Sequence, residues 1–151
     1  MSIDWKYKPF SDLTPGELYT ILRLRNEVFV VEQNCVFQDA DNKDQLSHHI
    51  MGWNNDILVA YARLVPAGIS YSEPSIGRVV TSPNARSLGM GKELMRQAIS
   101  ILYATWGKTN IKIGAQLYLE QFYNSFGFQR TSEIYLEDGI DHIEMVLQNS
   151  H

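Results

Sequence analysis

The sequence holds 151 residues, of which 44% are hydrophobic and 20% charged, the balance of a globular protein rather than a disordered or fibrous one. The net charge of −4, with scattered Lys and Arg residues, argues against nucleic acid as a partner and mildly favours a cationic substrate such as an amine. The single cysteine, Cys35, cannot form an internal disulfide and is typical of a reducing compartment.

The chain shows no sign of division into parts. It contains no internal repeat, low-complexity segment or Pro/Gly-rich linker, so we expect residues 1–151 to form a single domain with one core. The first residues lack a basic stretch followed by an apolar one, and no run of about 18 uncharged apolar residues occurs. We therefore expect a cytoplasmic protein without a membrane partner.

The first predicted elements are a strand and a capped helix. The strand is expected around Ile3 to Tyr7. The run Thr14-Pro15-Gly16-Glu17 is a capping box with proline at the first helical position, so a helix begins there. Apolar residues at helical spacing continue this helix to about Val31, and Arg25 interrupts them with a polar side chain.

A long polar segment and three strands follow. Residues 33–47 carry several aspartates and show no periodicity, which predicts a long loop of the kind that is often functional. Two strands are expected at Ile50 to Trp53 and Ile57 to Val65, separated by the turn-prone Asn54-Asn55-Asp56. A third strand, Ser75 to Thr81, should be buried because of its β-branched residues.

The second half predicts two more helices and a hairpin. After a glycine-bearing turn, a long helix should end near Gly107, and Lys112 to Ala115 should form a short strand. A short helix runs from Leu119 and is closed by Gly127; the hairpin then pairs Phe128 to Leu136 with Ile140 to Leu147. The order β-α-β-β-β-α-β-α-β-β predicts an α/β fold whose central sheet carries helices on both faces.

The junction between the strand Ser75 to Thr81 and the long helix has the features of an anion site. The segment from Arg86 to Lys92, Arg-Ser-Leu-Gly-Met-Gly-Lys, follows a buried strand and opens a helix. Free amides at a helix N-terminus point outward, and the helix dipole adds about half a positive charge. Gly89 and Gly91 lack Cβ atoms that would keep phosphate oxygens away from the backbone. Arg86 can add a direct contact.

Two familiar phosphate-binding motifs fail on spacing. A Walker loop needs glycine where Arg86 stands and Ser or Thr where Glu93 stands, and a dinucleotide fingerprint needs glycine at Leu94. The pattern Arg-x-x-Gly-x-Gly instead resembles the diphosphate loop of the GNAT N-acetyltransferase superfamily, which also follows a strand and a proline.

A second motif strengthens this resemblance. Gln116, Phe122-Tyr123 and Gly127-Phe128 resemble the superfamily's Asn-x-x-Ala-x-x-x-Tyr-x-x-x-Gly-Phe, with Gln116 in place of Asn and Leu119 in place of Ala. Ser87 replaces a frequent glycine of the diphosphate loop. The departure at position 116 concerns the usual side-chain contact to pantetheine and leaves the backbone contacts intact.

Three further runs resemble the ElaA branch of the superfamily, namely residues 24–35, 38–41 and 135–145. The resemblance implies a GNAT-type mixed central sheet and acetyl-CoA as co-substrate, with no metal. It also implies direct attack of a primary amine on the thioester in a ternary complex. The cofactor-binding positions it implies are Val79, Val80, Thr81, Arg86, Ser87, Leu88, Gly89, Met90, Gly91, Lys92, Gln116 and Phe122.

Two other functions stay open at this point. A non-catalytic acyl-CoA-binding regulatory domain could keep the diphosphate loop without turnover. A structural or interaction protein could use the glycine turn as an ordinary helix entry, although the paired motifs speak against it. The acceptor is either a small-molecule or a peptide amine, and the oligomeric state is open between a monomer and a homodimer.

The reaction requires an acid for the leaving thiolate and a base for the amine. For an amine of pKa about 10.4, deprotonation at pH 7 costs roughly 4.6 kcal/mol, from the gap of about 3.4 units. Tyr123 is the candidate acid because the resemblance places a phenol near the sulfur at this position. The alternative is that Tyr123 is one core aromatic in a stripe with Phe122 and Phe126.

Glu32 is the candidate base, because it lies where the first helix meets the long loop, a region that borders the acceptor site in this superfamily. A solvated glutamate at a helix end is the alternative. His49 and His142 have suitable intrinsic pKa values, yet each flanks a strand, where histidine is more often structural. Glu144 could act from the last strand or could face solvent.

A metal site is not expected. Asp39, Asp41 and Asp44 suggest calcium, but Asp44 falls where an EF-hand needs glycine and Ile50 where it needs glutamate. The adjacent His48 and His49 would point to opposite faces of an extended chain. Cys35 is expected to be a plain thiol, because direct transfer needs no nucleophilic cysteine.

Overall fold

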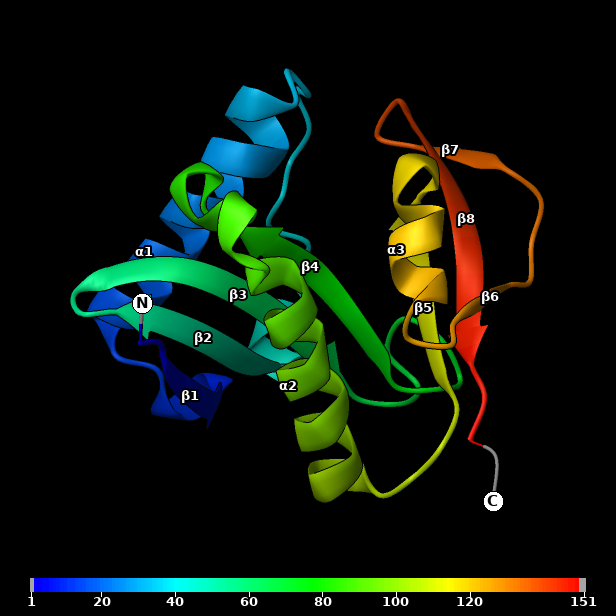
Figure 1. The fold of residues 1–151 in the computed structure, drawn as a ribbon, viewed down its shortest axis with the longest axis horizontal. Coiled ribbons are helices and arrows are strands. Elements are labelled where there is room, and N and C mark those ends of the chain that lie inside the picture. The colour runs from blue at the N-terminus through cyan, green and yellow to red at the C-terminus, as the bar shows by residue number, and fades with distance from the viewer. Residues whose placement is uncertain (1, 150–151) are drawn as a thin grey trace.

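A computed structural model describes residues 2–149, apart from the side chains of Ser87 and Leu88. The chain folds into two antiparallel sheets that diverge from a common edge (Figure 1). The strands are β1 (Asp4–Pro9), β2 (His48–Asn54), β3 (Ile57–Val65), β4 (Ser75–Thr81), β5 (Ile111–Gln116), β6 (Gln129–Arg130), β7 (Tyr135–Glu137) and β8 (Ile140–Leu147).

Three α-helices and several shorter helical segments connect the strands. The α-helices are α1 (Pro15–Arg25), α2 (Met90–Trp106) and α3 (Glu120–Asn124). Helix α1 continues without a break as a π-helix, η2 (Asn26–Glu32). The 3₁₀ segments are η1 (Phe10–Asp12), η3 (Asp44–Leu46), η4 (Pro83–Leu88) and η5 (Leu117–Leu119).

The first sheet has the order β1-β2-β3-β4, and the second has the order β5-β8-β6 with β7 also paired to β8. The sheets approach each other where β4 and β5 begin: the Lys112 N–H donates to the Pro74 carbonyl over 3.1 Å. Beyond this point β4 and β5 separate, as Figure 1 shows. The divergence leaves backbone groups of both strands without a ladder partner, so an extended ligand can lie between them.

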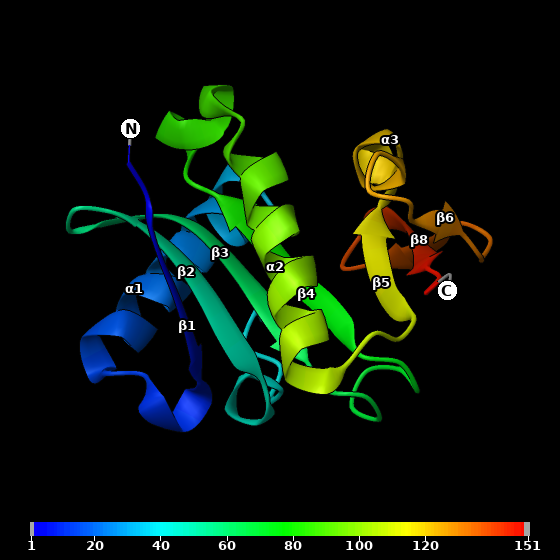
Figure 2. The same cartoon turned by 60° about the horizontal axis from the view of Figure 1, so that its bottom comes forward.

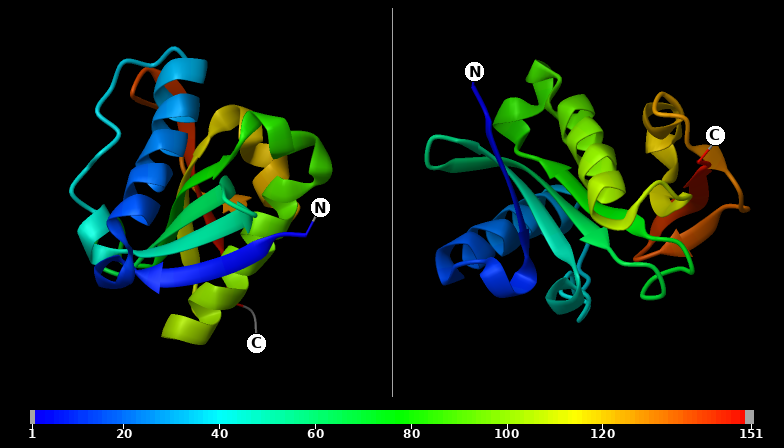
Figure 3. Two further views of the ribbon diagram at one scale, coloured as in Figure 1. Left: turned by 90° about the vertical axis from the view of Figure 1, so that its left-hand side faces the viewer. Right: turned by 90° about the horizontal axis from the view of Figure 1, so that it is seen from below.

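The helices cover both faces of the first sheet. Helix α1 lies on one face and α2 on the other (Figure 3), while α3 covers the second sheet on the same side as α2 (Figure 2). Leu94, Ala98 and Leu102 of α2 are fully buried, and they pack with Ile113 and Met145 of the second sheet in one core cluster. The α/β fold class and the helices on both faces are confirmed.

Local signals in the sequence agree with most element boundaries. The capping box is present: the Glu17 N–H donates to Thr14 Oγ1 over 3.1 Å, and the Thr14 N–H donates to Glu17 Oε1 over 2.8 Å. Strand β4 has the predicted ends, and α2 ends one residue before Gly107. No helix among residues 2–149 is long and apolar enough to cross a membrane.

The prediction of one continuous strand from Phe128 to Leu136 is wrong. This segment forms the two short strands β6 and β7, with a loop between them. The Glu144 N–H of β8 donates to the Ser132 hydroxyl over 2.8 Å, so a side chain takes the place of a backbone carbonyl. Pairing with β8 is interrupted there, an effect that single-strand periodicity does not reveal.

Candidate active site

A cavity of about 1420 Å³ opens between the two sheets, larger than the roughly 300–1,000 Å³ of pockets for drug-sized ligands. One end lies at the N-terminus of α2 and the other lies between η2, β4 and the β7–β8 hairpin. We call these the diphosphate end and the acceptor end. Of the residues implied by the resemblance, those lining the cavity are Glu32, Val79, Val80, Thr81, Arg86, Gly89, Gly91, Lys92, Gln116, Phe122 and Tyr123.

Three further predicted positions, 87, 88 and 90, are not among these lining residues. The Met90 side chain is buried in the core beneath α2, so only its backbone amide can face a ligand. The side chains of Ser87 and Leu88 lie outside the described part of the structure. The prediction of cofactor contacts at positions 87 and 88 therefore stays untested.

The N-terminus of α2 has no side-chain cap, in contrast to that of α1. Its N-cap is Gly89, at φ +69 and ψ 19, a left-handed conformation in which other residues are strained. A Cβ built on Gly89 meets nothing within 4 Å, and one on Gly91 meets only Phe122 at 3.6 Å. The first amides of a helix lack intrahelical acceptors, so the open end of α2 presents N–H donors and the positive end of the helix dipole to the cavity.

Arg86 does not point freely into the diphosphate end. Its guanidinium forms a bidentate ion pair with Glu32, with Nη1 2.8 Å from Oε2. The hydrogen bonds from Arg86 hold the pKa of Glu32 below its ordinary value. Glu32 and Arg86 thus bind each other, although the sequence predicted that Glu32 acts on the acceptor and that Arg86 binds the cofactor.

Tyr123 lies in the wall of the cavity between β5 and α3. It is 7% exposed, packs edge-to-face against Phe122 and Phe128, and forms no hydrogen bond through its hydroxyl among the described residues. Burial raises the pKa of the Tyr123 phenol above its ordinary value. The side chain is therefore a neutral phenol whose hydroxyl donates no hydrogen bond to a described residue.

Strand β4 carries a bulge at the centre of the cavity. Val80 pairs with Tyr61 and Gly77 with Arg63, so Arg78 and Val79 together face a single residue of β3. Arg78 has φ +50. A bulge leaves an unpaired residue in the ladder, and Arg78 and Val79 both line the cavity.

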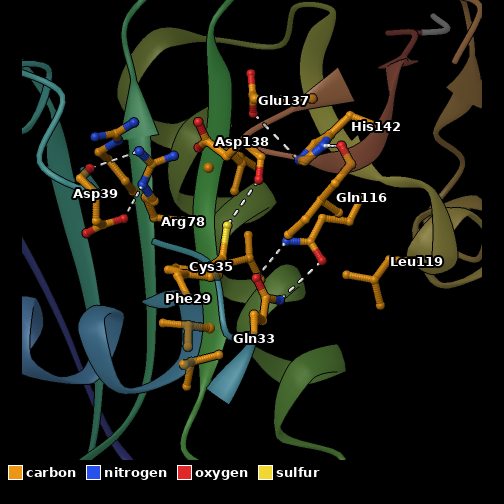
Figure 4. Close-up of a pocket in the computed structure, with 18 of the residues that line it drawn as sticks. Phe29, Gln33, Cys35, Asp39, Arg78, Gln116, Leu119, Glu137, Asp138 and His142 are labelled. Carbon is orange, nitrogen blue, oxygen red and sulfur yellow. Dashed lines mark hydrogen bonds and ion pairs between the residues drawn. The ribbon is translucent and has the colours of Figure 1, made fainter. Parts of the chain in front are cut away.

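The end of η2 and the following loop reach across to the second sheet. The side-chain amides of Gln33 and Gln116 exchange two hydrogen bonds of 3.2 and 3.3 Å. The Cys35 thiol donates to the Asp138 carbonyl over 3.1 Å. Figure 4 shows both contacts crossing the cavity. Gln116, the predicted pantetheine contact, is thereby tied to the acceptor end.

Ion pairs between buried arginines and aspartates stabilise the acceptor end. Arg25 is fully buried and donates to Asp39 and Asp44 over 2.8 Å each. Arg63 donates over 2.8 Å to Asp44 and over 2.7 Å to Asp41. No group of three or more His, Cys, Asp or Glu within residues 2–149 is arranged to hold a metal ion. These aspartates form ion pairs with arginine side chains.

These ion pairs change the acidity of the aspartates. Burial alone would raise the pKa of Asp44, but hydrogen bonds from Arg25 and Arg63 outweigh it, and this pKa lies below its ordinary value. Burial and Arg63 act on Asp41 in the same opposed way, and its pKa is strongly lowered. Both aspartates therefore stay ionised at neutral pH.

The two candidate histidines, His49 and His142, have different surroundings. His49 is fully buried and both its nitrogens are engaged: Nδ1 accepts from the Tyr61 hydroxyl over 2.7 Å, and Nε2 donates to the Asp44 carbonyl over 3.0 Å. Burial lowers the pKa of His49, so this histidine is structural. His142 lines the cavity, and its Nδ1 lies 2.7 Å from the Ile140 carbonyl.

Glu144 lies beside phenols in the same wall. It pairs with Gly114 across β5 and β8 and lies 3.3 Å from Lys112 Nζ. A Cβ on Gly114 would lie 3.0 Å from the hydroxyls of both Tyr71 and Tyr135, so the two phenols converge over a position that only glycine leaves open. The sequence did not indicate Tyr71 or Tyr135 as site residues.

The comparisons with known proteins agree with this geometry. Residues 26–149 match the family described as acetyltransferase (GNAT) domain. The chain is 43% identical over 145 residues to protein ElaA of Escherichia coli, with 95% of each chain covered. The chain belongs to the GNAT family. Its ElaA-like character, implied by residues 24–35 and 135–145, is also confirmed.

Solved GNAT structures share the fold over the whole length. An acyl-CoA N-acyltransferase from Pseudomonas aeruginosa superposes with a TM-score of 0.92 at 43% identity, covering 96% of this chain and 99% of that one. Escherichia coli ElaA superposes with a TM-score of 0.91 at 41% identity, covering 97% and 100%. Membership of this GNAT family supports acyl-CoA-dependent acyl transfer as the activity class.

Proposed function

We propose that this GNAT protein transfers the acetyl group of acetyl-CoA directly to a primary amine in a ternary complex. One observation carries the proposal: the uncapped N-terminus of α2 and the neutral phenol of Tyr123 line the same cavity. A protein that only bound acyl-CoA would need the first feature and not the second.

The diphosphate end supplies backbone donors and two cations. The amides at the start of α2, held open by Gly89, fit phosphate oxygens because a Cβ at position 89 would meet no described atom within 4 Å. Lys92 lines the same end and adds a point charge. Arg86 can contribute once it leaves Glu32.

The centre of the cavity supplies the groups that the acyl transfer requires. When bound, acetyl-CoA supplies an activated carbonyl carbon. Backbone amides at the β4 bulge near Val79 suit an oxyanion. Tyr123 holds a proton that it can deliver to the leaving sulfur, and its raised pKa keeps this proton in place until a strong base appears.

The acceptor end suits an amine because the C-terminal part of the chain lines it with carboxylates. Glu137, Asp138 and Glu144 line it, and anionic groups raise the local concentration of a cationic substrate. Glu32 remains the base predicted from the sequence, but it must first separate from Arg86. The free thiol of Cys35 suits a reducing compartment, and we place the enzyme, as a single domain, in the cytoplasm.

Two measurements test the proposal. Acetyl-CoA should raise the melting temperature, with a larger shift at a higher ligand concentration, because only the folded state binds it. A panel of primary amines should then release free CoA, detected with a thiol reagent, with at least one member above the rate of hydrolysis. A melting shift without CoA release from any amine would replace the enzyme with an acyl-CoA-binding module. Absence of a shift would refute the cofactor site.

A further inference from the structure

We infer that His142, through its Nε2 atom, takes the proton from the acceptor amine. This inference rests on the function proposed above, and it concerns a residue whose sequence context favoured a structural role. It starts from the tautomer. The Ile140 carbonyl oxygen can only accept, so the 2.7 Å contact requires a proton on His142 Nδ1. The neutral ring then carries its lone pair on Nε2.

The surroundings of Nε2 suit proton uptake. A Glu137 carboxylate oxygen lies 3.6 Å away, too far to bind the neutral ring and close enough to stabilise an imidazolium. Figure 4 shows the ring between Glu137 and Gln116 on the cavity side of β8. The Glu137 side chain is 54% exposed, so a proton held by His142 has a route to solvent.

The strand pairing places His142 at the acceptor end. His142 pairs with Gln116 of β5 and also with Tyr135 of β7, and residues directly opposite in a sheet share a face. Because Gln116 contacts Gln33 from the opposite wall, this face looks into the cavity. Of the three histidines in residues 2–149, His142 alone lines it.

Other ionisable groups around His142 come from several elements. Tyr135 and Glu137 lie on β7, Asp138 lies in the β7–β8 turn, and Cys35 faces this turn from the η2 side. Glu144 lies two residues along β8 and is paired with Lys112. Carboxylates predominate in this group, which suits a cationic amine as the substrate.

The proton and electron balance is complete without any other reactant. One proton of the substrate ammonium passes to Nε2 and leaves to solvent past Glu137. The freed nitrogen lone pair forms the C–N bond, and the C–S bond breaks with its electrons on sulfur. Tyr123 donates its proton to this sulfur and regains one from the acylated nitrogen. The products are the amide, free CoA and one released proton.

The first experiment reads the tautomer directly and does not depend on the acceptor. Long-range proton–nitrogen spectra of the ¹⁵N-labelled protein, with the His142→Gln variant to assign the signals, should show a neutral ring protonated on Nδ1. A neutral ring protonated on Nε2 would overturn the inference.

The second experiment measures the pH dependence of kcat/KM for an amine that supports turnover. His142→Gln should lower kcat/KM by about 100-fold at pH 7, the lower limit for loss of an acid–base group. The melting shift with acetyl-CoA should persist, and the activity should approach that of the unchanged protein as the pH rises above the amine's pKa of about 10.4. Glu137→Gln should lower kcat/KM less than His142→Gln does, since it removes the carboxylate 3.6 Å from Nε2 but leaves the base itself.

His48→Gln is the matched control, because His48 lies outside the cavity and contacts Tyr7 and Trp106; its profile should stay unchanged. A uniform loss in His142→Gln that high pH does not rescue would show a structural role and overturn the inference, as would an unchanged kcat/KM at pH 7. If the unchanged protein released no CoA with any amine, the proposed function would fail instead, and the tautomer measurement would still stand.

Discussion

The two ends of the cavity are lined by different kinds of groups, mainly backbone at one end and side chains at the other. The diphosphate end consists mainly of backbone, namely the first amides of α2 and the glycines at 89 and 91, with the cations Arg86 and Lys92 beside them. The acceptor end consists of side chains from η2, its following loop, β4, β5 and β8. A backbone site depends on local conformation, whereas a side-chain site depends on how distant segments meet. The first can keep one cofactor while the second changes its substrate.

Removing the Tyr123 hydroxyl tests the point where the two ends meet. Tyr123→Phe should lower kcat by about 100-fold or more, because the leaving sulfur loses its proton donor, while acetyl-CoA affinity stays the same. Stopped-flow assays of CoA release and calorimetric titration measure the two quantities. Tyr118→Phe is the control, a 72% exposed phenol lining the same cavity. An unaltered kcat in Tyr123→Phe would reduce Tyr123 to a packing residue.

Breaking the buried ion pairs should damage the support of the acceptor end. Asp44→Asn leaves Arg25 and Arg63 with one partner fewer in a buried site, and removal of one member of a buried pair costs about 3–5 kcal/mol. Urea denaturation at pH 7 measures the loss in the free energy of unfolding. Asp12→Asn, at an exposed position, should be neutral. A loss of similar size in both variants would contradict this account.

The same ion pairs predict how stability depends on pH. Folding lowers the pKa values of Asp41 and Asp44, so the stability they contribute is complete above the unfolded value of about 3.9. It is lost as the pH falls below that value toward the folded pKa values. Denaturation curves between pH 7 and pH 2 should show this decline, and Asp44→Asn should flatten it. A decline of equal steepness in that variant would assign it to other carboxylates.

Blocking the backbone site should affect the cofactor alone. Gly89→Val should weaken acetyl-CoA binding by about tenfold or more, equivalent to about 1.4 kcal/mol, because a side chain covers the α2 amides and strains a residue at φ +69. Gly68→Val is the matched control, since Gly68 has φ +90 and open space around it and does not line the cavity. Equal affinities in the two variants would remove the diphosphate site from α2.

The smallest effect is expected at the exposed pair between the two ends. Glu32→Gln removes the carboxylate that holds Arg86, so acetyl-CoA should bind slightly more tightly, and the gain should shrink at high salt because exposed pairs are screened. Titrations at two ionic strengths measure this. Loss of turnover at unchanged affinity would instead support Glu32 as the base.

Much of this protein could be predicted from the sequence because its signals are local. The Thr14–Glu17 box starts α1, the period of 3.6 marks α2, and glycines at 89 and 91 leave the helix end open. Each depends on residues a few positions apart, so the sequence alone predicts the open end of α2 and the family. The continuous strand over residues 128–136 failed because the Ser132 contact with Glu144 depends on a partner strand.

Only the tertiary structure decided what the ionisable side chains do. Glu32 and Arg86 are 54 positions apart and still form an ion pair. His49 and His142 look alike in sequence, yet one is enclosed by Tyr61 and Asp44 while the other faces the cavity. The state of a titratable group is set by burial and by charges within a few ångströms, and those neighbours come from distant parts of the chain.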